Sequence, residues 1–194
     1  MFFSKFLLFA ASVAALPSAM PSLEARQFAD TIVKNGTFGE PFGLGRDVPI
    51  NLLYPAGQNG AIMVEYQHSK ARELLTVVSR IPVEPFDGFF PLEPVAYRMT
   101  VSFRNGGGGN FDLLKLDYIL NQDKVGKLNI RNAVFAKRNT NGGISIATDG
   151  PIAFTSNSQQ TMVSMNLGGK GALDGEWAFF VPLADAIAGG LTTA

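Results

Sequence analysis

Short segments in which apolar and polar residues alternate follow one another along most of this chain. Met99, Val101 and Phe103 alternate with arginine, threonine and serine residues. Residues 114–120 and 163–167 repeat the pattern. Because successive side chains of a strand point to opposite faces, a period of two predicts strands with one buried and one solvated face.

Further short apolar runs are bounded by glycine, proline and asparagine, which is typical of strands separated by turns. These runs cover residues 48–54, 61–66, 74–79, 127–130, 133–137, 144–148, 152–155 and 177–181. Together they predict an all-β fold, a single antiparallel β-sandwich of the jelly-roll or Ig-like kind. Little helix is expected. One short helix is predicted at residues 182–188, which begin at a proline and are followed by two glycines.

Three polar or glycine-rich stretches are the main turn candidates. Asn141 and Gly142 predict a hairpin with a type I′ turn, since an Asn-Gly pair tolerates the positive φ angles of that turn. Residues 105–109 hold an asparagine and four glycines, and they predict a flexible hairpin loop. Residues 69–75 are compatible with a helical turn or with a hairpin that joins the strands on either side.

The first 26 residues predict a secretory signal peptide. Lys5 is followed by an apolar run at residues 6–16 and then by small residues, which is the arrangement of such leaders. The apolar run is too short to span a bilayer, so no stable membrane insertion is expected. We expect a secreted protein, extracellular or in the cell wall, with one domain at residues 27–194. Cleavage is expected after Ala15, Ala19, Ala25 or Arg26, and a cut after Arg26 would remove a short pro-segment.

Charge and cysteine content exclude several classes of function. The chain has 16 basic and 16 acidic residues, so it lacks the positive field that nucleic-acid binding requires. It has no cysteine, which excludes a thiol nucleophile, a zinc-thiolate site and disulfides. We expect no cofactor and no metal. The sequon Asn35-Gly36-Thr37 predicts a glycoprotein with its glycan on Asn35.

A pair of carboxylates and a single histidine are the catalytic candidates of the sequence. Asp174 and Glu176 are two positions apart, a spacing that can place two carboxylates on one face of a strand as in a glycosidase. The neighbouring glycines indicate a turn instead, so no catalytic residue is predicted. His68 is the only histidine and lies in a polar stretch, so it is expected to be an exposed turn residue.

Residues 82–94 form the strongest candidate contact segment. They hold four prolines together with Phe86, Phe89 and Phe90. Aromatic rings on a stiff backbone can present a contact surface at low entropic cost. The alternative is that these rings fold inward as a lid over one end of the sandwich. Trp177 is expected in the core.

The function that fits these observations is binding without catalysis. We expect a secreted β-sandwich protein that binds a glycan, a cell-wall polymer or a protein surface through its end loops, with Phe86, Phe89 and Phe90 as the named contacts. One alternative is a carboxylate-dependent polysaccharide hydrolase. Another is a structural or wall-associated protein without a small ligand. Oligomeric state is not predicted.

Overall fold

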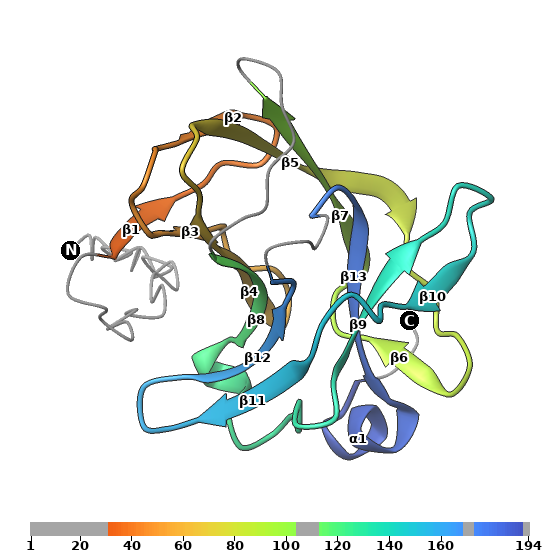
Figure 1. Ribbon diagram of the computed structural model, residues 1–194. Helices are drawn as coiled ribbons and strands as arrows, with labels where there is room; N and C mark the ends of the chain where they lie inside the picture. Colours follow the sequence, from red (N-terminus) through yellow and green to blue (C-terminus); the bar gives the residue numbers. More distant parts are fainter. Residues whose placement is uncertain (1–30, 104–112, 169–172, 192–194) are drawn as a thin grey trace, which may run out of the picture.

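The computed structural model describes residues 31–103, 113–168 and 173–191. Two β-sheets lie face to face, and Figure 1 shows them on opposite sides of a shared interior. In the described part of the chain one sheet has six strands and the other has seven. The predicted all-β sandwich is therefore confirmed.

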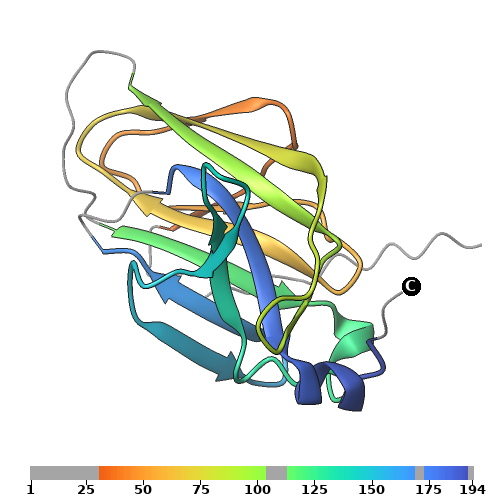
Figure 2. The ribbon, with the colours of Figure 1, turned by 90° about the vertical axis from the view of Figure 1, so that its right-hand side faces the viewer.

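Sheet A contains, in spatial order, β1 (Ile32–Asn35), β3 (Ile50–Leu53), β4 (Gly60–Gln67), β8 (Leu113–Leu120), β12 (Thr161–Asn166) and β11 (Ile152–Ser156). Sheet B contains β10 (Ile144–Ile146), β9 (Val134–Arg138), β13 (Gly175–Pro182), β7 (Val95–Phe103), β5 (Arg72–Pro82) and β2 (Pro41–Leu44), while β6 (Phe89–Pro91) also pairs with β13. The pairs are antiparallel except β1 with β3, which is parallel. Within the described ranges there are also two short helices, η1 (Gln122–Lys124) and α1 (Leu183–Ala188). Figure 2 shows both at the same end of the sandwich.

The core between the sheets is built from the alternating positions of the sequence. Tyr118 from β8 and Phe179 from β13 are buried there, and their ring centroids lie 5.0 Å apart. Phe135 packs edge-on against Phe179 at 5.2 Å. Trp177 is also fully buried, as expected. Because the packed aromatic rings remove a large apolar area from water, they stabilise the sandwich without disulfides.

Residues 177–181 of β13 are apolar without alternation because both faces of this part of the strand are covered. Its inward residues join the main core, whereas Ala178 and Phe180 belong to a second cluster on the outer face of sheet B. That cluster also contains Val83, Ala96 and Ala136. Segment 82–94 supplies part of the cover, as described below. A strand buried on both faces reads as a continuous apolar run.

Several sequence-based predictions of local structure are wrong. Residues 127–130 lie in a loop, although their apolar side chains Leu128 and Ile130 are buried in the core. Residues 69–71 connect strands of different sheets, since β4 pairs with β3 and β8 whereas β5 pairs with β2 and β7. Neither the helical turn nor the hairpin, the two alternatives for residues 69–75, is present. The hydrophobic periodicity of a sequence predicts which residues are buried, but it does not predict which strands pair with each other.

The predictions for the two glycine-containing turns, at residues 105–109 and at Asn141-Gly142, are considered separately. Residues 105–109 lie outside the described residues, but β7 before them and β8 after them belong to different sheets. These two strands therefore do not pair with each other. Asn141 and Gly142 do lie in the β9–β10 hairpin, but its loop has five residues and of these two only Gly142 has a positive φ, of 86°. The hairpin is confirmed and the type I′ turn is wrong.

The short helix predicted at residues 182–188 is confirmed as α1, which begins at Leu183. Among the residues described here, no helix has the length and apolar character needed to cross a bilayer. The predicted signal peptide at residues 1–26 lies outside the described residues.

Candidate functional site

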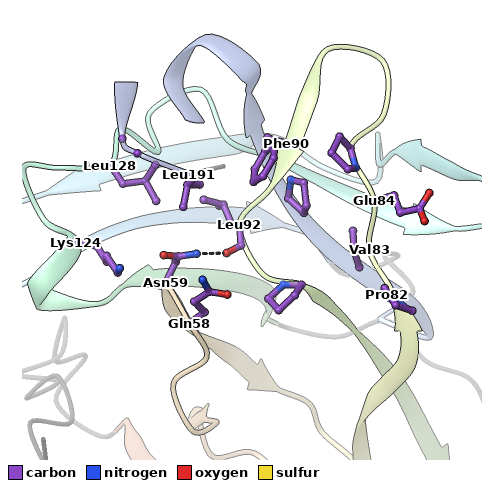
Figure 3. A pocket seen from close by; sticks show the side chains of 15 residues that line it. Gln58, Asn59, Pro82, Val83, Glu84, Phe90, Leu92, Lys124, Leu128 and Leu191 are labelled. Carbon is purple, nitrogen blue, oxygen red and sulfur yellow. Dashed lines mark hydrogen bonds between the residues drawn. The ribbon is translucent and has the colours of Figure 1, made fainter. Parts of the chain in front are cut away.

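A pocket of about 510 Å³ opens at the end of the sandwich that carries the helices. Figure 3 shows its lining side chains. Four separate parts of the chain form the walls: the turn before β4, segment 82–94, the η1 region and the residues after α1. The lining residues are Gln58, Asn59, Pro82, Val83, Glu84, Pro85, Phe90, Pro91, Leu92, Pro94, Lys124, Leu128, Gly189, Gly190 and Leu191.

Segment 82–94 is a rigid flap, and it contributes most of the lining residues of this end pocket. At its base the Val83 N–H donates to the Pro94 carbonyl at 3.0 Å. At its tip Asp87 and Gly88 have φ angles of 46° and 79°, while Phe86 and Phe89 exchange two backbone hydrogen bonds. Positive φ at both central residues is the geometry of a type I′ hairpin turn. Strand β6 then pairs with β13, which fixes the flap to sheet B.

The three candidate phenylalanines do not share one surface. Phe90 is 9% exposed, belongs to the main core and lines the end pocket. Phe86 and Phe89 are half-buried on the outer face of sheet B, stacked with centroids 5.9 Å apart. Phe86 also packs edge-on against Phe180 at 4.7 Å. The flap therefore covers the outer face of one sheet while it sends one ring into the interior. A contact role for these rings stays a prediction.

A buried carboxylate joins the flap to the opposite sheet. Glu93 is 2% exposed, and its Oε1 accepts hydrogen bonds from the N–H groups of Asn59 and Gly60 at 2.9 and 2.8 Å. Its Oε2 accepts the Gln58 N–H at 2.7 Å. The Tyr118 hydroxyl donates to Oε1 at 2.7 Å. Four donors compensate the charge, since hydrogen bonds to an ionised acceptor are the strong ones.

Burial and the Glu93 carboxylate raise the pKa values of two tyrosines, Tyr118 and Tyr97. Burial raises the pKa of Tyr118 well above its usual value, and the negative charge and hydrogen bond of Glu93 raise it further. Burial, followed by the charge of Glu93, also raises the pKa of Tyr97. Both phenols therefore stay protonated at neutral pH, so Tyr118 remains a hydrogen-bond donor to Glu93.

Asn59 is the buried polar group of the pocket wall. It is 3% exposed, and its Nδ2 donates to the Leu92 carbonyl at 2.7 Å. That bond fixes which end of the carboxamide is nitrogen, because a flipped amide would turn its oxygen toward another acceptor. The Oδ1 atom has no hydrogen-bond partner among the described residues. Figure 3 shows this oxygen on the side of Lys124.

The remaining walls are held by backbone hydrogen bonds. The Asn121 N–H donates to the Asn59 carbonyl at 2.8 Å, so the turn before β4 is fixed from both sides. On the opposite wall the Leu191 N–H donates to the Ala186 carbonyl at 2.9 Å, which brings the chain after α1 back over the core. Leu191 is half-buried against that core and Leu128 is buried within it. The pocket therefore has an ordered frame.

Charged groups lie at the rim of the pocket. Lys124 is half-buried and its Nζ lies 3.8 Å from Asp123 Oδ2, a long contact in a solvated setting. Glu84 is exposed, and Figure 3 shows its carboxylate directed away from Asn59. Exposed ion pairs contribute little to stability. Lys124 is therefore available as a hydrogen-bond donor to a bound molecule.

A second cavity lies on the other side of the flap. It has a volume of about 360 Å³ and shares Pro82, Glu84 and Pro85 with the end pocket. Phe86 and Arg138 also line it. Phe89 lines neither cavity. It is connected to the second cavity through its stacking contact with Phe86.

The expected exposure of His68 is wrong. The residue is 1% exposed, its Nδ1 accepts the Lys70 N–H at 2.8 Å, and its Nε2 lies 3.2 Å from a guanidinium nitrogen of Arg72. His68 lies at the start of the connection between β4 of sheet A and β5 of sheet B. This polar turn packs against the edge of the core. A polar sequence around a residue therefore does not establish that it is exposed.

The carboxylates weighed for hydrolysis are both engaged in structural contacts. Asp174 Oδ1 accepts the Val101 N–H at 2.7 Å. Glu176 is 7% exposed and pairs with Arg138 at 2.8 Å and with Arg98 at 3.2 Å. These contacts join β13 to the strands on either side of it. Within the described ranges, no group of three or more acidic or histidine side chains could hold a metal ion.

Comparison with known protein families, with curated proteins and with solved structures finds no match to this chain.

Sequence reasoning located the flap but missed Glu93, Asn59 and Tyr118. One signal was available: Asp87-Gly88 between two phenylalanines is a hairpin turn pair, and it would have placed Phe86 and Phe89 opposite each other. Nothing in the local pattern indicates that Glu93 meets a turn more than 30 residues earlier.

Proposed function

We propose that this chain is a secreted, non-catalytic binding protein that holds its ligand in the end pocket. The observation that carries the proposal is the pocket itself, which is of the size that accommodates small molecules or protruding groups of larger ones. Its frame is ordered before binding, because Glu93 ties the turn before β4 to the flap. Little conformational entropy is then lost when a ligand enters.

The ligand classes predicted from the sequence were a glycan, a cell-wall polymer and a protein surface. All three can extend beyond the pocket. A ligand that leaves the end pocket across Pro85 reaches the second cavity and meets Phe86. In this proposal Phe90 contacts the inserted group, Phe86 contacts the part that follows, and Phe89 supports Phe86 by stacking.

A pair of tryptophan variants tests the proposal. Gln58 is exposed at the pocket rim, and the structure shows its backbone rather than its side chain bonded to Glu93. Gln58→Trp should fill the pocket and leave the fold intact. Ser158 is exposed in the turn between β11 and β12, outside the pocket, so Ser158→Trp is the matched control.

The measurement is binding of the purified protein to the isolated cell-wall fraction of its source. We expect Gln58→Trp to lower this binding by at least about tenfold, which corresponds to about 1.4 kcal/mol, with the control unchanged. Equal binding by both variants at unchanged thermal midpoints would remove the end pocket as the binding site.

A further inference from the structure

Sheet A buries apolar side chains on its outer face as well as on its inner face. In β4, Ile62 and Val64 point into the main core, whereas Ala61 and Met63 belong to a separate cluster. The members of that cluster, none more than 5% exposed, are Leu53, Ala61, Met63, Ile119 and Met162. The strand register places them side by side on β3, β4, β8 and β12. Within the described ranges no further apolar side chain packs against them. Because the outer face of an antiparallel sandwich is ordinarily polar and solvated, this burial indicates a covering segment outside those ranges.

A buried carboxylate lies in the middle of the same face. Asp117 of β8 is 0% exposed, and the register places it between Met63 and Ser164. The other charged residues of the four strands are Glu65 and Lys115, which pair with each other. The face therefore carries one net negative charge. A buried carboxylate favours a cation that can reach it, and the planar guanidinium of arginine matches carboxylate geometry best.

The chain before Thr31 can supply both an apolar cover and a cation. Figure 1 shows β1 at the edge of sheet A beside β3, so the residues that precede β1 start next to this face. Residues 20–30 include the apolar residues Leu23 and Phe28. Arg26 is the single basic residue among them.

The length of this segment allows Arg26 to reach Asp117. The register aligns Ile32 with Leu114 across β3 and β4, and Asp117 lies three residues further along β8. Ile32 and Asp117 are therefore about 17 Å apart, from the spacing of strands and the rise per residue. The six residues from Arg26 to Ile32 span about 20 Å when extended.

The other segments outside the described ranges are too short to cover the cluster. Residues 104–112 end at Leu113, and Ile119 lies six residues along β8, about 20 Å away. Going there and back would take about 12 residues. Residues 169–172 are likewise tied at both ends and are fewer. Residues 192–194 span about 10 Å, less than the width of about 14 Å across four strands.

We infer that residues 20–30 dock on the outer face of sheet A, with the Arg26 guanidinium beside the Asp117 carboxylate. This surface is separate from the end pocket, so the inference goes beyond the proposed function and does not depend on it. Cleavage after Ala15 or Ala19 leaves the segment in place. Cleavage after Arg26 leaves only four residues before Thr31. The cleavage site then decides whether this apolar face is covered.

Methionine oxidation tests the cover, because the thioethers of Met63 and Met162 are oxidised where solvent reaches them. Two processed forms are compared, one beginning at Met20 and one at Gln27. After a pulse of hydrogen peroxide, peptide mass spectrometry gives the oxidation rate of each methionine. We expect Met63 and Met162 to react at least about tenfold faster in the shorter form. Met165, which is buried in the main core, should react slowly in both.

Three results would overturn the inference. Fast oxidation in both forms would show that the segment does not cover the face. Slow oxidation in both would show that the cover lies after Arg26. Protection of the longer form that disappears on dilution would assign a second copy of the chain as the occupant.

Variants of the longer form test the ion pair, and they report even where the shorter form fails to fold. Arg26→Gln should raise the oxidation rate of Met63 about threefold, since Met63 lies beside Asp117, and Arg26→Lys should restore most of the protection. Lys34→Gln changes an exposed residue of β1 and should have no effect. Equal rates for the two glutamine variants would overturn the pairing.

A photoreactive benzoylphenylalanine in place of Phe28 locates the segment directly. In the longer form it should cross-link to peptides of β3, β4, β8 or β12. Cross-links to sheet B alone, or none within the chain, would overturn the inference.

Discussion

The Tyr118 hydroxyl donates a 2.7 Å hydrogen bond to Oε1 of Glu93 and thereby joins the inner face of sheet A to the flap on sheet B. Tyr118 comes from β8, whereas Glu93 follows β6. The same carboxylate accepts hydrogen bonds from three N–H groups, two in the turn before β4 and one at the first residue of β4. Glu93 therefore joins two walls of the end pocket.

Replacing Glu93 should destabilise the fold strongly. Glu93→Gln removes the charge and turns an N–H₂ group toward at least one donor, so we expect a loss of about 2–4 kcal/mol in the free energy of unfolding. Glu84→Gln changes an exposed residue of the same flap and should cost less than about 0.5 kcal/mol. Urea titration of both variants measures the difference. Similar losses would show that the Glu93 contacts contribute little.

The raised tyrosine pKa predicts a loss of stability at alkaline pH. Burial and Glu93 raise the pKa of Tyr118 in the folded chain above the value of about 10 that it has when unfolded. The folded state therefore keeps its proton longer, and the stability contributed by protonated Tyr118 is complete below about pH 10 and is lost as pH rises through the folded pKa.

Tyr118→Phe isolates this effect. We expect its free energy of unfolding to fall less steeply than that of wild type as pH rises above about 9. Tyr97 remains in both proteins, so its own raised pKa acts on the slopes of both. Urea titrations at a series of pH values provide the slopes. Parallel slopes for the two proteins would contradict the assignment.

The packing of Phe179 provides a test of which strand residues point into the core and which point to solvent. Its ring contacts those of Tyr97, Tyr118 and Phe135, and it is 1% exposed. Phe179→Ala should cost about 3–5 kcal/mol through lost burial and cavity formation. Thr100→Ala, on the exposed face of β7, should cost under about 1 kcal/mol. Equal shifts in thermal midpoint would mean that the inner and outer faces are misassigned.

The predicted secretion, processing and glycosylation can be tested on protein expressed in a eukaryotic host. Asn35 and Thr37 are both exposed, so the sequon is accessible. We expect the intact mass of the protein from a eukaryotic host to include a glycan that Asn35→Gln removes. N-terminal sequencing should begin after one of the predicted cleavage sites. An intact Met1 terminus, recovered from the cytosol, would contradict secretion.

The sequence predicted the sandwich because its signals are local. Alternation at residues 114–120 and 163–167 required only the strand period, and the structure places the apolar positions of both runs in the core. Strand pairing could not be predicted from the order of strands in the chain, since β4 and β5 are consecutive but belong to different sheets. The side chain of Phe103 lies outside the described residues, so its predicted inward position stays a prediction.

In the candidate site, too, the features with a local signal were predicted and those that depend on long-range contacts were not. The proline-rich flap was visible as composition, and the structure places Phe90 in the pocket wall. Asn59 and Glu93 were not identified because their roles depend on a contact between residues 34 positions apart. Such contacts arise from the assembled sheets, and a single sequence carries no periodic signal for them.

The most direct test of the account is to observe which residues of the protein respond to its ligand. Soluble fragments released from the cell-wall fraction would be titrated into the ¹⁵N-labelled chain. The account predicts chemical-shift changes at the Asn59 side-chain amide and at the backbone amides of Gln58, Leu92 and Leu191, with Ser158 unchanged. Saturating shifts confined to residues outside the end pocket, or no shifts from fragments of a wall fraction that binds the protein, would contradict it.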